Sequence, residues 1–355
     1  MTRLRPLLLT LCTILAAQDP DLESLRKDGH WKQLRTRTTG WVAAKPQDPY
    51  ALLWSSRVKG AFRDLEGALD LARKAAELKA DDPDILSNLA VWASETAGAT
   101  DGKIKQMSLA REMKKAGEAA LALKPGHKEA SERMLGYYLG APSLLGGGVS
   151  KAKELAEQVA RIDQVNGLLF QAQIALFQKD KSGATALLGQ ALAKDPKSYD
   201  ALMTLAFIPL RDRPQDLDKA LEAYRRAVAV RPKSARAHSQ IAAILAEQGK
   251  WPELETELAE AKQQLPENLA PWYAAGSNLI GEKKHLDRAE TLLRTYLAQP
   301  PEGYAATFAD VHWQLGKLKE LLGKPQEAIP EYEQALKLKP GHKQATEGLA
   351  KLKKG

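Results

Sequence analysis

The sequence predicts an all-α protein built from repeated helical hairpins, and three observations support this prediction. Ala, Leu, Lys and Glu dominate its 355 residues, and these side chains lose little on entering a helix. Aromatic residues make up only 6% of the chain, and the β-branched and aromatic runs typical of buried strands are nearly absent. Finally, one spacing of small, apolar and turn-forming residues recurs along most of the chain, as in a repeat array.

Residues 1–17 are typical of a secretory signal peptide. Arg3 and Arg5 form a short positive region, an apolar run from Pro6 to Leu15 follows, and we place the cleavage site after Ala17. The apolar run is too short to span a bilayer, and no later segment resembles a transmembrane helix. We therefore expect an exported chain, periplasmic or extracellular, that is not an integral membrane protein. The alternative is an apolar helix at the start of a cytosolic protein.

Cys12, the only cysteine, lies inside this segment. The sequence Leu9-Thr10-Leu11-Cys12 resembles the lipid-attachment box of bacterial lipoproteins, although Leu11 stands where a small residue is expected. Lipoprotein anchoring through Cys12 is therefore an alternative. Without it, the mature chain has no disulfide, thiol nucleophile or thiolate metal ligand.

The chain is mildly basic. It has 52 Lys and Arg residues against 44 Asp and Glu, a formal net charge of +8, and removing Arg3 and Arg5 leaves 50 against 44, or +6. Such an excess favours an acidic partner or an envelope surface. It is too diffuse to indicate nucleic-acid binding.

The repeat is clearest between Ala309 and Pro340. The residues that carry it are Leu315-Gly316, Gly323, Ala328, Tyr332, Ala335-Leu336 and Pro340. Their types and spacings closely resemble the tetratricopeptide pattern, in which Leu-Gly, Gly, Ala, Tyr or Phe, Ala and Pro recur within one unit.

Parts of the same pattern continue through almost the whole chain from about residue 22. Further matches are Leu52, Ala68, Ala72, Ala75, Leu86, Leu89 and Ala90; Ala184, Leu188, Ala191-Leu192 and Pro196; Ala220, Tyr224, Ala227 and Pro232; Ile241-Ala242, Gly249, Ala261 and Pro266; and Ala289, Leu293, Leu297 and Pro301. The resemblance implies an all-α, right-handed superhelical solenoid of about nine helical hairpins. We expect it to occupy residues 18–355 as a single domain, with residues 343–355 as a C-terminal capping helix.

Elementary packing explains why these positions are constrained. Each unit is a hairpin whose apolar stripe recurs at helical spacing, and small residues such as Ala220, Ala328 and Ala335 allow two helices to cross closely. Gly249 and Gly323 occupy turns, where glycine tolerates positive φ. One hairpin cannot bury its own apolar face, so stability comes from stacking on neighbours.

Two segments interrupt the period. Thr96 to Gln106 is expected to be a long polar connection. Gly140 to Ser150 (GAPSLLGGGVS) is expected to be a loop within one hairpin, with Ser150 as the N-cap of the next helix. The order of residues around this loop resembles one in a group of exported bacterial tetratricopeptide proteins.

No motif for catalysis, a cofactor or a metal emerges. Gly146-Gly147-Gly148 is followed by Ser150 and Lys151 in the reverse of the P-loop order, without a preceding strand. No two histidines stand three or four apart, and His127 and His342 both occur in Pro-Gly-His turns, which indicates a role in the repeat. No Gly-x-Ser-x-Gly elbow is present. We therefore expect no enzyme.

The resemblance implies that the first helix of each hairpin lines a concave, partner-binding face. Carried over position by position, the family pattern selects aromatic, basic and amide side chains, which could anchor a peptide and donate hydrogen bonds to it. The selected residues are Tyr50, Arg57, Asn166, Gln173, Phe177, Phe207, Arg211, Arg236, Gln240, Tyr273, Trp313 and Lys317. The alternative for Phe177, Phe207 and Trp313 is packing between helices.

Two functions follow from this interpretation. The first is a non-enzymatic scaffold of the bacterial cell envelope that binds a protein or peptide. The second is an accessory subunit of a solute transporter that holds a small molecule or lipid, which an apolar pocket closed by the Gly140–Ser150 loop would favour. The residue set with which some family members clamp a chaperone's C-terminal carboxylate is missing around Asp84, Asn88 and Val91.

Overall fold

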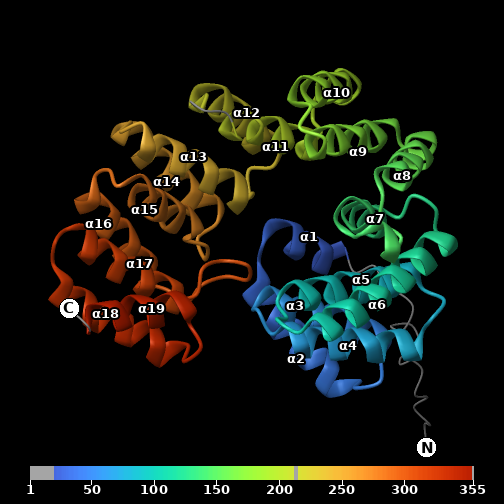
Figure 1. Ribbon diagram of the computed structural model, residues 1–355, viewed down its shortest axis with the longest axis horizontal. Helices are drawn as coiled ribbons and strands as arrows, with labels where there is room; N and C mark the ends of the chain where they lie inside the picture. Colours follow the sequence, from blue (N-terminus) through green and yellow to red (C-terminus); the bar gives the residue numbers. More distant parts are fainter. Residues whose placement is uncertain (1–19, 212–214, 354–355) are drawn as a thin grey trace, which may run out of the picture. The chain divides into compact units, whose positions relative to one another are not determined.

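The computed structural model describes residues 20–211 and 215–353, which form helices joined by turns and loops (Figure 1). They form nineteen α-helices and two short 3₁₀ turns, with no strand among them. The all-α prediction is therefore confirmed. The predicted signal peptide and Cys12 lie outside the described residues.

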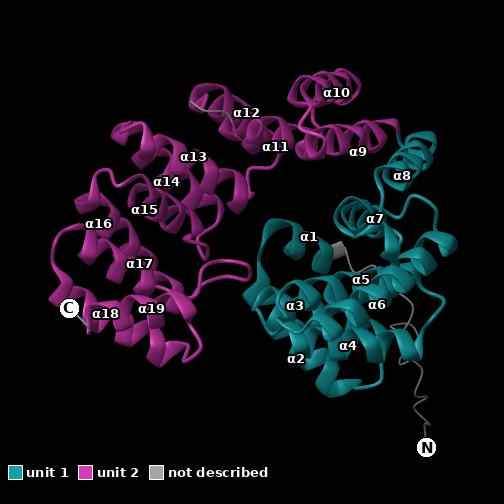
Figure 2. Cartoon of the chain, in the orientation of Figure 1, with its two compact units in different colours: residues 1–163 teal, residues 164–355 magenta. Residues whose placement is uncertain are grey.

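The chain divides into two compact units, residues 1–163 and residues 164–355 (Figure 2). Within unit 1, successive helices pack against one another along the sequence. Its elements are α1 (Pro20–Asp28), α2 (Trp31–Ala44), α3 (Pro49–Ala61), α4 (Leu65–Leu78), α5 (Pro83–Gly98), α6 (Lys103–Leu123), α7 (Lys128–Gly140), the 3₁₀ turn η1 (Ser143–Leu145) and α8 (Val149–Ile162).

Unit 2 is built in the same way. Its elements are α9 (Gln164–Phe177), α10 (Lys181–Lys194), α11 (Tyr199–Phe207), the 3₁₀ turn η2 (Pro209–Arg211), α12 (Leu217–Val230), α13 (Ala235–Glu247), α14 (Trp251–Gln264), α15 (Ala270–Glu282), α16 (Leu286–Tyr296), α17 (Phe308–Leu321), α18 (Pro325–Leu338) and α19 (Lys343–Leu352). Taken in order, α1 to α18 of the described residues pair into nine hairpins, and α19 packs on α17 and α18. The expected number of hairpins and the helix that follows the last of them are both confirmed.

The repeat positions play the structural roles that their residue types predict. Ala220, Ala328 and Ala335 are completely buried where helices cross. Gly249 and Gly323 adopt φ of 68° and 71° in the turns of two hairpins, a region that favours glycine because it has no Cβ. Each hairpin thus places its small and flexible residues where the helices must approach or reverse.

Helix starts follow the capping rules. Asp48 precedes α3, and its side chain accepts hydrogen bonds from the backbone N–H groups of Tyr50 and Ala51. Asp82 caps α5 in the same way. Both helices begin with a proline, which suits the first position because it has no backbone N–H that would need a hydrogen-bond acceptor there.

The expected long connection from Thr96 to Gln106 is wrong. Helix α5 continues to Gly98 and α6 already begins at Lys103, so only four residues join them. Thr96 is buried, and its hydroxyl donates to the carbonyl oxygen of Leu65 at 3.4 Å. This tertiary contact holds the last turn of α5 in place despite polar residues that suggested a loop.

The loop after α7 is confirmed, but Ser150 is not the N-cap of α8. The helix begins at Val149, Gly148 takes the capping position, and Ser150 is an exposed residue of the first turn. The Gly148 N–H donates to the Tyr138 carbonyl oxygen at 2.7 Å, and φ at Gly148 is 149°. Because this φ favours glycine, Gly148 caps the helix, and α8 begins two residues earlier than it would with Ser150 as the N-cap.

A buried histidine ties α13 to α14. His238 Nδ1 lies 2.6 Å from Glu257 Oε1, and Nε2 lies 2.7 Å from the carbonyl oxygen of Pro232. Both neighbours are acceptors, so only the doubly protonated ring satisfies both contacts. Burial alone would lower the pKa of His238, but the hydrogen bonds to Glu257 and Pro232 outweigh it, and the pKa is raised.

Candidate binding surfaces

The odd-numbered helices from α1 to α17 are the first helices of the hairpins, and they carry the residues predicted to meet a partner. All twelve lie on these helices except Arg211, which lies in η2 directly after α11. These residues differ in whether they are available to bind a partner, because some of them already form hydrogen bonds or ion pairs within the protein and others do not.

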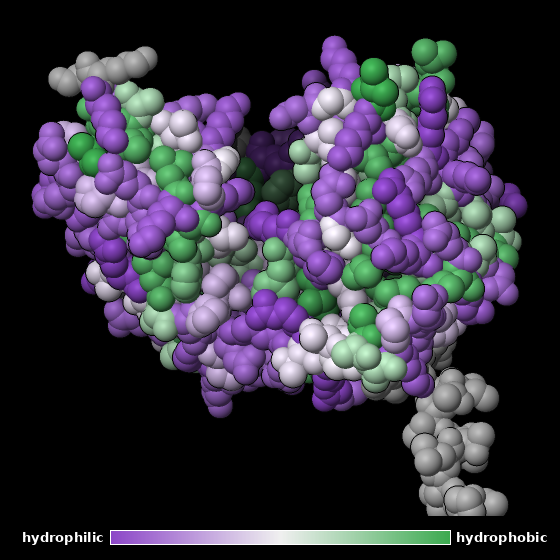
Figure 3. Space-filling model, turned by 90° about the horizontal axis from the view of Figure 1, so that it is seen from below, coloured by the Kyte–Doolittle hydropathy of each residue, from purple (hydrophilic) through white to green (hydrophobic). Residues whose placement is uncertain are grey.

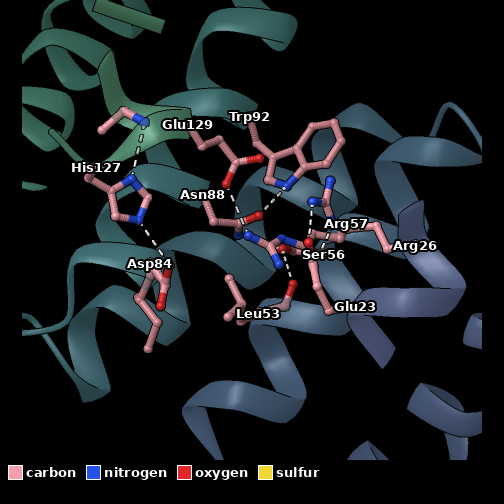
Figure 4. A network of polar contacts seen from close by, with 12 residues as sticks. Glu23, Arg26, Leu53, Ser56, Arg57, Asp84, Asn88, Trp92, His127 and Glu129 are labelled. Carbon is pink, nitrogen blue, oxygen red and sulfur yellow. Dashed lines mark hydrogen bonds and ion pairs between the residues drawn. The ribbon is translucent and has the colours of Figure 1, made fainter. Parts of the chain in front are cut away.

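In unit 1, Arg57 is held by a contact on its own helix and by one with α7, two hairpins later (Figure 4). Its guanidinium lies 4.9 Å from the ring centroid of Trp54 and donates to Glu129 Oε2 on α7 at 3.0 Å. Only 13% of its side chain is exposed. Arg57 is therefore neutralised inside the fold by Glu129. The repeat pattern does not select Glu129 as a partner-facing residue.

Tyr50, the other predicted residue on α3, is also bonded internally. Its hydroxyl donates to Asp82 Oδ2 at 2.6 Å. Burial raises the pKa of Tyr50, and the hydrogen bond to Asp82 and the negative charge of that group raise it further. Tyr50 thus links α3 to the start of α5.

A buried polar chain links α3 to α5 behind these residues (Figure 4). The Asn88 amide donates to Ser56 Oγ at 2.6 Å and accepts from Trp92 Nε1 at 3.0 Å. All three residues are buried. Because every contact is made within the unit, this chain specifies how the hairpins stack and offers nothing to a ligand.

The two Pro-Gly-His turns are structural and nearly identical. His127 Nδ1 accepts from the Ala130 N–H at the start of α7, and His342 Nδ1 accepts from the Ala345 N–H at the start of α19. Their Nε2 atoms face Asp84 at 2.9 Å and Asp310 at 3.3 Å, one hairpin earlier in each case. Within residues 20–211 and 215–353, no group of three or more His, Cys, Asp or Glu side chains could hold a metal ion.

In unit 2, α9 and α11 expose two aromatic rings. Asn166, Gln173 and Phe177 follow one another at intervals of seven and four residues, so they share one face of α9. Phe177 is 52% exposed and Phe207 is 48% exposed, so neither ring is buried between helices. Arg211 lies over the Phe207 ring at 5.8 Å.

The remaining aromatic residues of the set pack within unit 2. Tyr273 lies 5.5 Å from the ring of Tyr296, and Trp313 lies 5.8 Å from the ring of His342. Trp313 also packs against the cluster around Tyr332. Both are partly exposed, so they combine a packing role with an accessible edge.

Side-chain amides form hydrogen bonds between the first helices of successive hairpins in unit 2. Asn278 on α15 donates to the Ala243 carbonyl oxygen and to Glu247 on α13, at 3.1 and 3.0 Å. Gln314 on α17 donates to Ser277 on α15 at 2.8 Å. Helices α13, α15 and α17 therefore form one continuous row that also carries Arg236, Gln240, Tyr273, Trp313 and Lys317.

Three of the four carboxylates of this row are used within the fold. Glu247 accepts from Asn278, Glu320 accepts from Tyr332 and Lys351, and Asp310 caps α17 and faces His342. The remaining one, Glu282, follows Tyr273 by nine residues, or two and a half turns, which places it on the opposite side of α15.

Two cations of the same row are not used in this way. Within the described residues, neither Arg236 nor Lys317 makes an ion pair, whereas Lys319 is bonded to Glu290 and Glu327. The row thus keeps three of its four negative charges engaged and leaves two positive charges available, on the same three helices as Gln240, Tyr273 and Trp313.

A groove runs along α7 in unit 1. It has a volume of about 600 Å³ and follows one face of the helix from Glu129 through Arg133 and Gly136 to Gly140. Residues of α5, α6 and the loop after α7 complete it: Ser94, Ala97, Ala110, Met113, Ala141, Pro142 and Leu145. One end is therefore apolar and lies beside the loop, and the other end is charged.

Two glycines of α7 are a feature of the sequence that could have indicated this groove, although they do not belong to the repeat pattern. Gly136 and Gly140 stand four residues apart within a helix, where each glycine costs about 1 kcal/mol relative to alanine. A Cβ on either one would meet nothing within 4 Å, so packing does not require them.

Comparison with known families identifies two of the hairpin segments. Residues 215–249 match the family model described as TPR repeat, and residues 309–342 match the one described as tetratricopeptide repeat. These segments contain α12 with α13, and α17 with α18. A search of curated proteins returned no match.

Several solved structures resemble the chain. Yeast Tom70 is 16% identical with a TM-score of 0.47, covering 95% of this chain and 88% of that one. A tetratricopeptide repeat protein from Parabacteroides merdae is 14% identical with a TM-score of 0.43, covering 75% and 99%. A TPR protein from Thermus thermophilus is 20% identical with a TM-score of 0.37, covering 53% and 98%. At these values the similarities imply nothing about function.

The two matched repeats lie in a succession of helical hairpins whose alanine, glycine and proline positions obey the same pattern. The chain is therefore a tetratricopeptide-repeat (TPR) protein, with matched repeats at residues 215–249 and 309–342.

Proposed function

We propose that this protein is a non-enzymatic scaffold of the bacterial cell envelope, and that it holds an acidic segment of a partner protein on the first-helix row of unit 2. As a TPR-repeat protein the chain is a protein-interaction scaffold. The observation that carries the finer proposal is the pair of unengaged cations, Arg236 and Lys317. The carboxylates of their row are bonded internally, except Glu282, which lies on the opposite side of α15 from Tyr273.

The spacing of the row defines the expected partner segment. Neighbouring packed helices lie about 8–10 Å apart, so α13 and α17 are about 16–20 Å apart. Arg236 is the second residue of α13 and Lys317 the tenth of α17, an offset of about 12 Å along the helices, so the two residues are separated by about 20–23 Å. An extended peptide covers this distance with about six or seven residues. We therefore expect two acidic residues at that separation, with backbone amides or apolar side chains between them meeting Gln240 and Tyr273.

Export to the envelope is supported by the signal-peptide pattern of residues 1–17. It is tested by mass spectrometry of the chain recovered from cell fractions. A mature N-terminus at Gln18 in the periplasmic or extracellular fraction supports the proposal, and a full-length chain in the cytosol contradicts it.

The binding proposal is tested by a crosslinking pull-down from the envelope fraction. The bait is the chain from Gln18, compared with an Arg236→Gln/Lys317→Gln variant. The matched control, Arg226→Gln/Lys337→Gln, removes the same charge from exposed residues of the second helices α12 and α18. A protein recovered by the wild type and the control, but lost with the first variant, supports a partner on the first-helix row. Equal recovery by all three baits excludes that row.

The groove along α7 favours a second candidate function, an accessory subunit that holds a small molecule or lipid for a solute transporter. Its volume of about 600 Å³ lies within the range of ligand pockets, and the loop after α7 borders its apolar end. Native mass spectrometry of the purified chain would detect a bound molecule. A Gly136→Leu variant should lose that molecule, because the new side chain would occupy the middle of the groove.

A further inference from the structure

One end of unit 1 carries the two most exposed large apolar side chains of the described residues. Leu144, in η1, is 93% exposed, and Ile104, in the first turn of α6, is 88% exposed; the next is Ile162 at 59%. Charged and polar residues cover most of the face seen in Figure 3, with apolar residues interspersed. Single apolar residues in such a surface are ordinary, but side chains this exposed contribute nothing to the core.

The antiparallel course of the helices brings these two residues to the same end of the unit. Helices α6, α7 and α8 reverse direction at each connection, so the start of α6, the loop after α7 and the start of α8 lie together. Pro142 and Leu145 of the loop share the groove lining with Ala110 of α6. From Ala110, α6 continues for six residues, about 9 Å, to Ile104.

The same end is strongly basic. A Cβ built on Gly146 in the loop would lie 2.9 Å from Nζ of Lys114, on α6, and 3.5 Å from Nζ of Lys151, on α8. Residues 103–162 contain eleven Lys and Arg against six Asp and Glu, so this sixth of the chain carries +5 of its formal net charge of +8. The chain's basic excess is therefore concentrated in α6 to α8; Lys103, Lys105 and Lys151 lie towards the end that carries Leu144 and Ile104, whereas Lys124, Lys128 and Arg161 lie at the opposite end.

Few carboxylates offset these lysines. Glu118 lies 3.8 Å from Lys114, a long contact, and Glu66 pairs with Lys105 at 2.6 Å. Asp101 is exposed in the turn before α6. Two ammonium groups against one loop repel each other, so an anion between them would relieve the repulsion.

We propose that this end of unit 1 docks on an anionic phospholipid surface. Leu144 and Ile104 enter the interface, and Lys114 and Lys151 contact phosphate headgroups. A bilayer presents an anionic layer directly above an apolar one, which matches lysines set behind exposed apolar side chains. This docking is peripheral: no helix among residues 20–211 and 215–353 is long and apolar enough to cross a membrane. It is independent of the partner row in unit 2.

Co-sedimentation with lipid vesicles tests the proposal. The protein is the chain from Gln18, which keeps every described helix and removes the apolar run of residues 6–15 that would bind lipid by itself. We expect binding to vesicles that contain phosphatidylglycerol and not to pure phosphatidylcholine vesicles. Binding should weaken greatly in about 1 M NaCl, where the Debye length is about 3 Å.

An apolar variant, Leu144→Ser/Ile104→Ser, should lower the partition coefficient on anionic vesicles by about tenfold or more, because burial of one such side chain is worth about a decade. The control, Leu322→Ser/Leu338→Ser, makes the same exchange at exposed positions of unit 2 and should bind as the wild type does. Thermal unfolding of each variant verifies that it remains folded.

A charge variant, Lys114→Gln/Lys151→Gln, should lower the partition coefficient about thirtyfold, since each of the two lysines near an anionic surface contributes about 1 kcal/mol and a decade is 1.4 kcal/mol. Lys337→Gln/Lys339→Gln is the matched control at exposed positions of unit 2.

Three outcomes would overturn the proposal. The first is an absence of binding to anionic vesicles, or an equal loss in the control variants. The second is binding to polyglutamate without binding to vesicles, which would assign the surface to an acidic protein. The third is release from vesicles by inorganic phosphate but not by chloride at equal ionic strength, which would assign the lysines to free phosphate.

Discussion

Replacing Gly60 with alanine should destabilise unit 1, although this exchange normally stabilises a helix. Gly60 lies within α3, and a Cβ built on it would be 1.9 Å from Cη2 and 2.0 Å from Cζ3 of Trp92 on α5. The Trp92 ring is buried, and its Nε1 donates to Asn88 at 3.0 Å, so it cannot retreat without breaking this bond.

The magnitude follows from three opposing contributions. Alanine in place of glycine within a helix gains about 1 kcal/mol. Forcing an extra methyl group against a packed ring costs about 1–3 kcal/mol, and separating Trp92 from Asn88 leaves buried polar groups unpaired at a cost of about 1–3 kcal/mol. The net expected loss is about 2–3 kcal/mol.

Urea denaturation followed by circular dichroism and tryptophan fluorescence measures this loss. With a denaturant slope of about 2 kcal/mol/M, the midpoint for unit 1 should fall by about 1 M. Midpoints are compared directly because repeat proteins often unfold in more than one step. Gly40→Ala is the matched control: Gly40 also lies within a helix, a Cβ there meets nothing within 4 Å, and the midpoint should rise slightly.

A double-mutant cycle identifies the cause. In a Trp92→Leu background the ring is absent, so Gly60→Ala should cost much less than in the wild type. An unchanged or higher midpoint for Gly60→Ala alone would show that Trp92 does not cover Gly60, and the alignment of α3 against α5 would be wrong.

Four further outcomes follow from the same structure. The raised pKa of His238 means that its stabilisation is fully present below its unfolded value of about 6.5 and is lost as pH rises through the folded value; urea midpoints between pH 5.5 and 8 should fall for the wild type and change less for His238→Gln. Ala328→Leu should destabilise its hairpin by about 1–3 kcal/mol, and an unchanged melting curve would refute the packing of α18. His127→Ala should cost about 1–2 kcal/mol in urea unfolding, because it removes both an N-cap and a contact with Asp84. Gly136→Ala should raise the melting temperature, since its Cβ meets nothing, and a lower value would mean that α7 packs more closely there.

The features of this fold that the sequence predicts are those set by short-range constraints. Alanines at helix crossings and glycines at turns recur because every hairpin has the same geometry, as Ala328 and Gly323 illustrate. The errors arise where a distant residue overrides local preference. Thr96 remains helical because its hydroxyl reaches Leu65, and Ser150 is not a cap because Gly148 is fixed by a bond to Tyr138.

The binding residues are harder to predict, because availability depends on what the neighbouring repeats supply. Arg57 and Arg236 are both cations on first helices, and the repeat pattern selects both of them as partner-facing residues. A carboxylate 72 residues later, Glu129, occupies Arg57, whereas no described carboxylate reaches Arg236. Repeat spacing says which positions face a partner, but only the three-dimensional pairing says which of them remain unoccupied.

This competition suggests how such a scaffold acquires specificity. A polar side chain on a first helix can form its hydrogen bond or ion pair with a neighbouring repeat or with a partner protein. One interaction weakens the other, because both use the same donor or acceptor atom. Where a neighbouring repeat provides an acceptor, as Asp84 does for His127 from one hairpin earlier, the contact stabilises the stack. Where it provides none, as at Lys317, the unused charge is left for a ligand. Specificity can therefore change without any substitution of the binding side chain. A substitution of the residue that pairs with it inside the fold is enough to make that side chain available to a partner or to remove it from the binding surface.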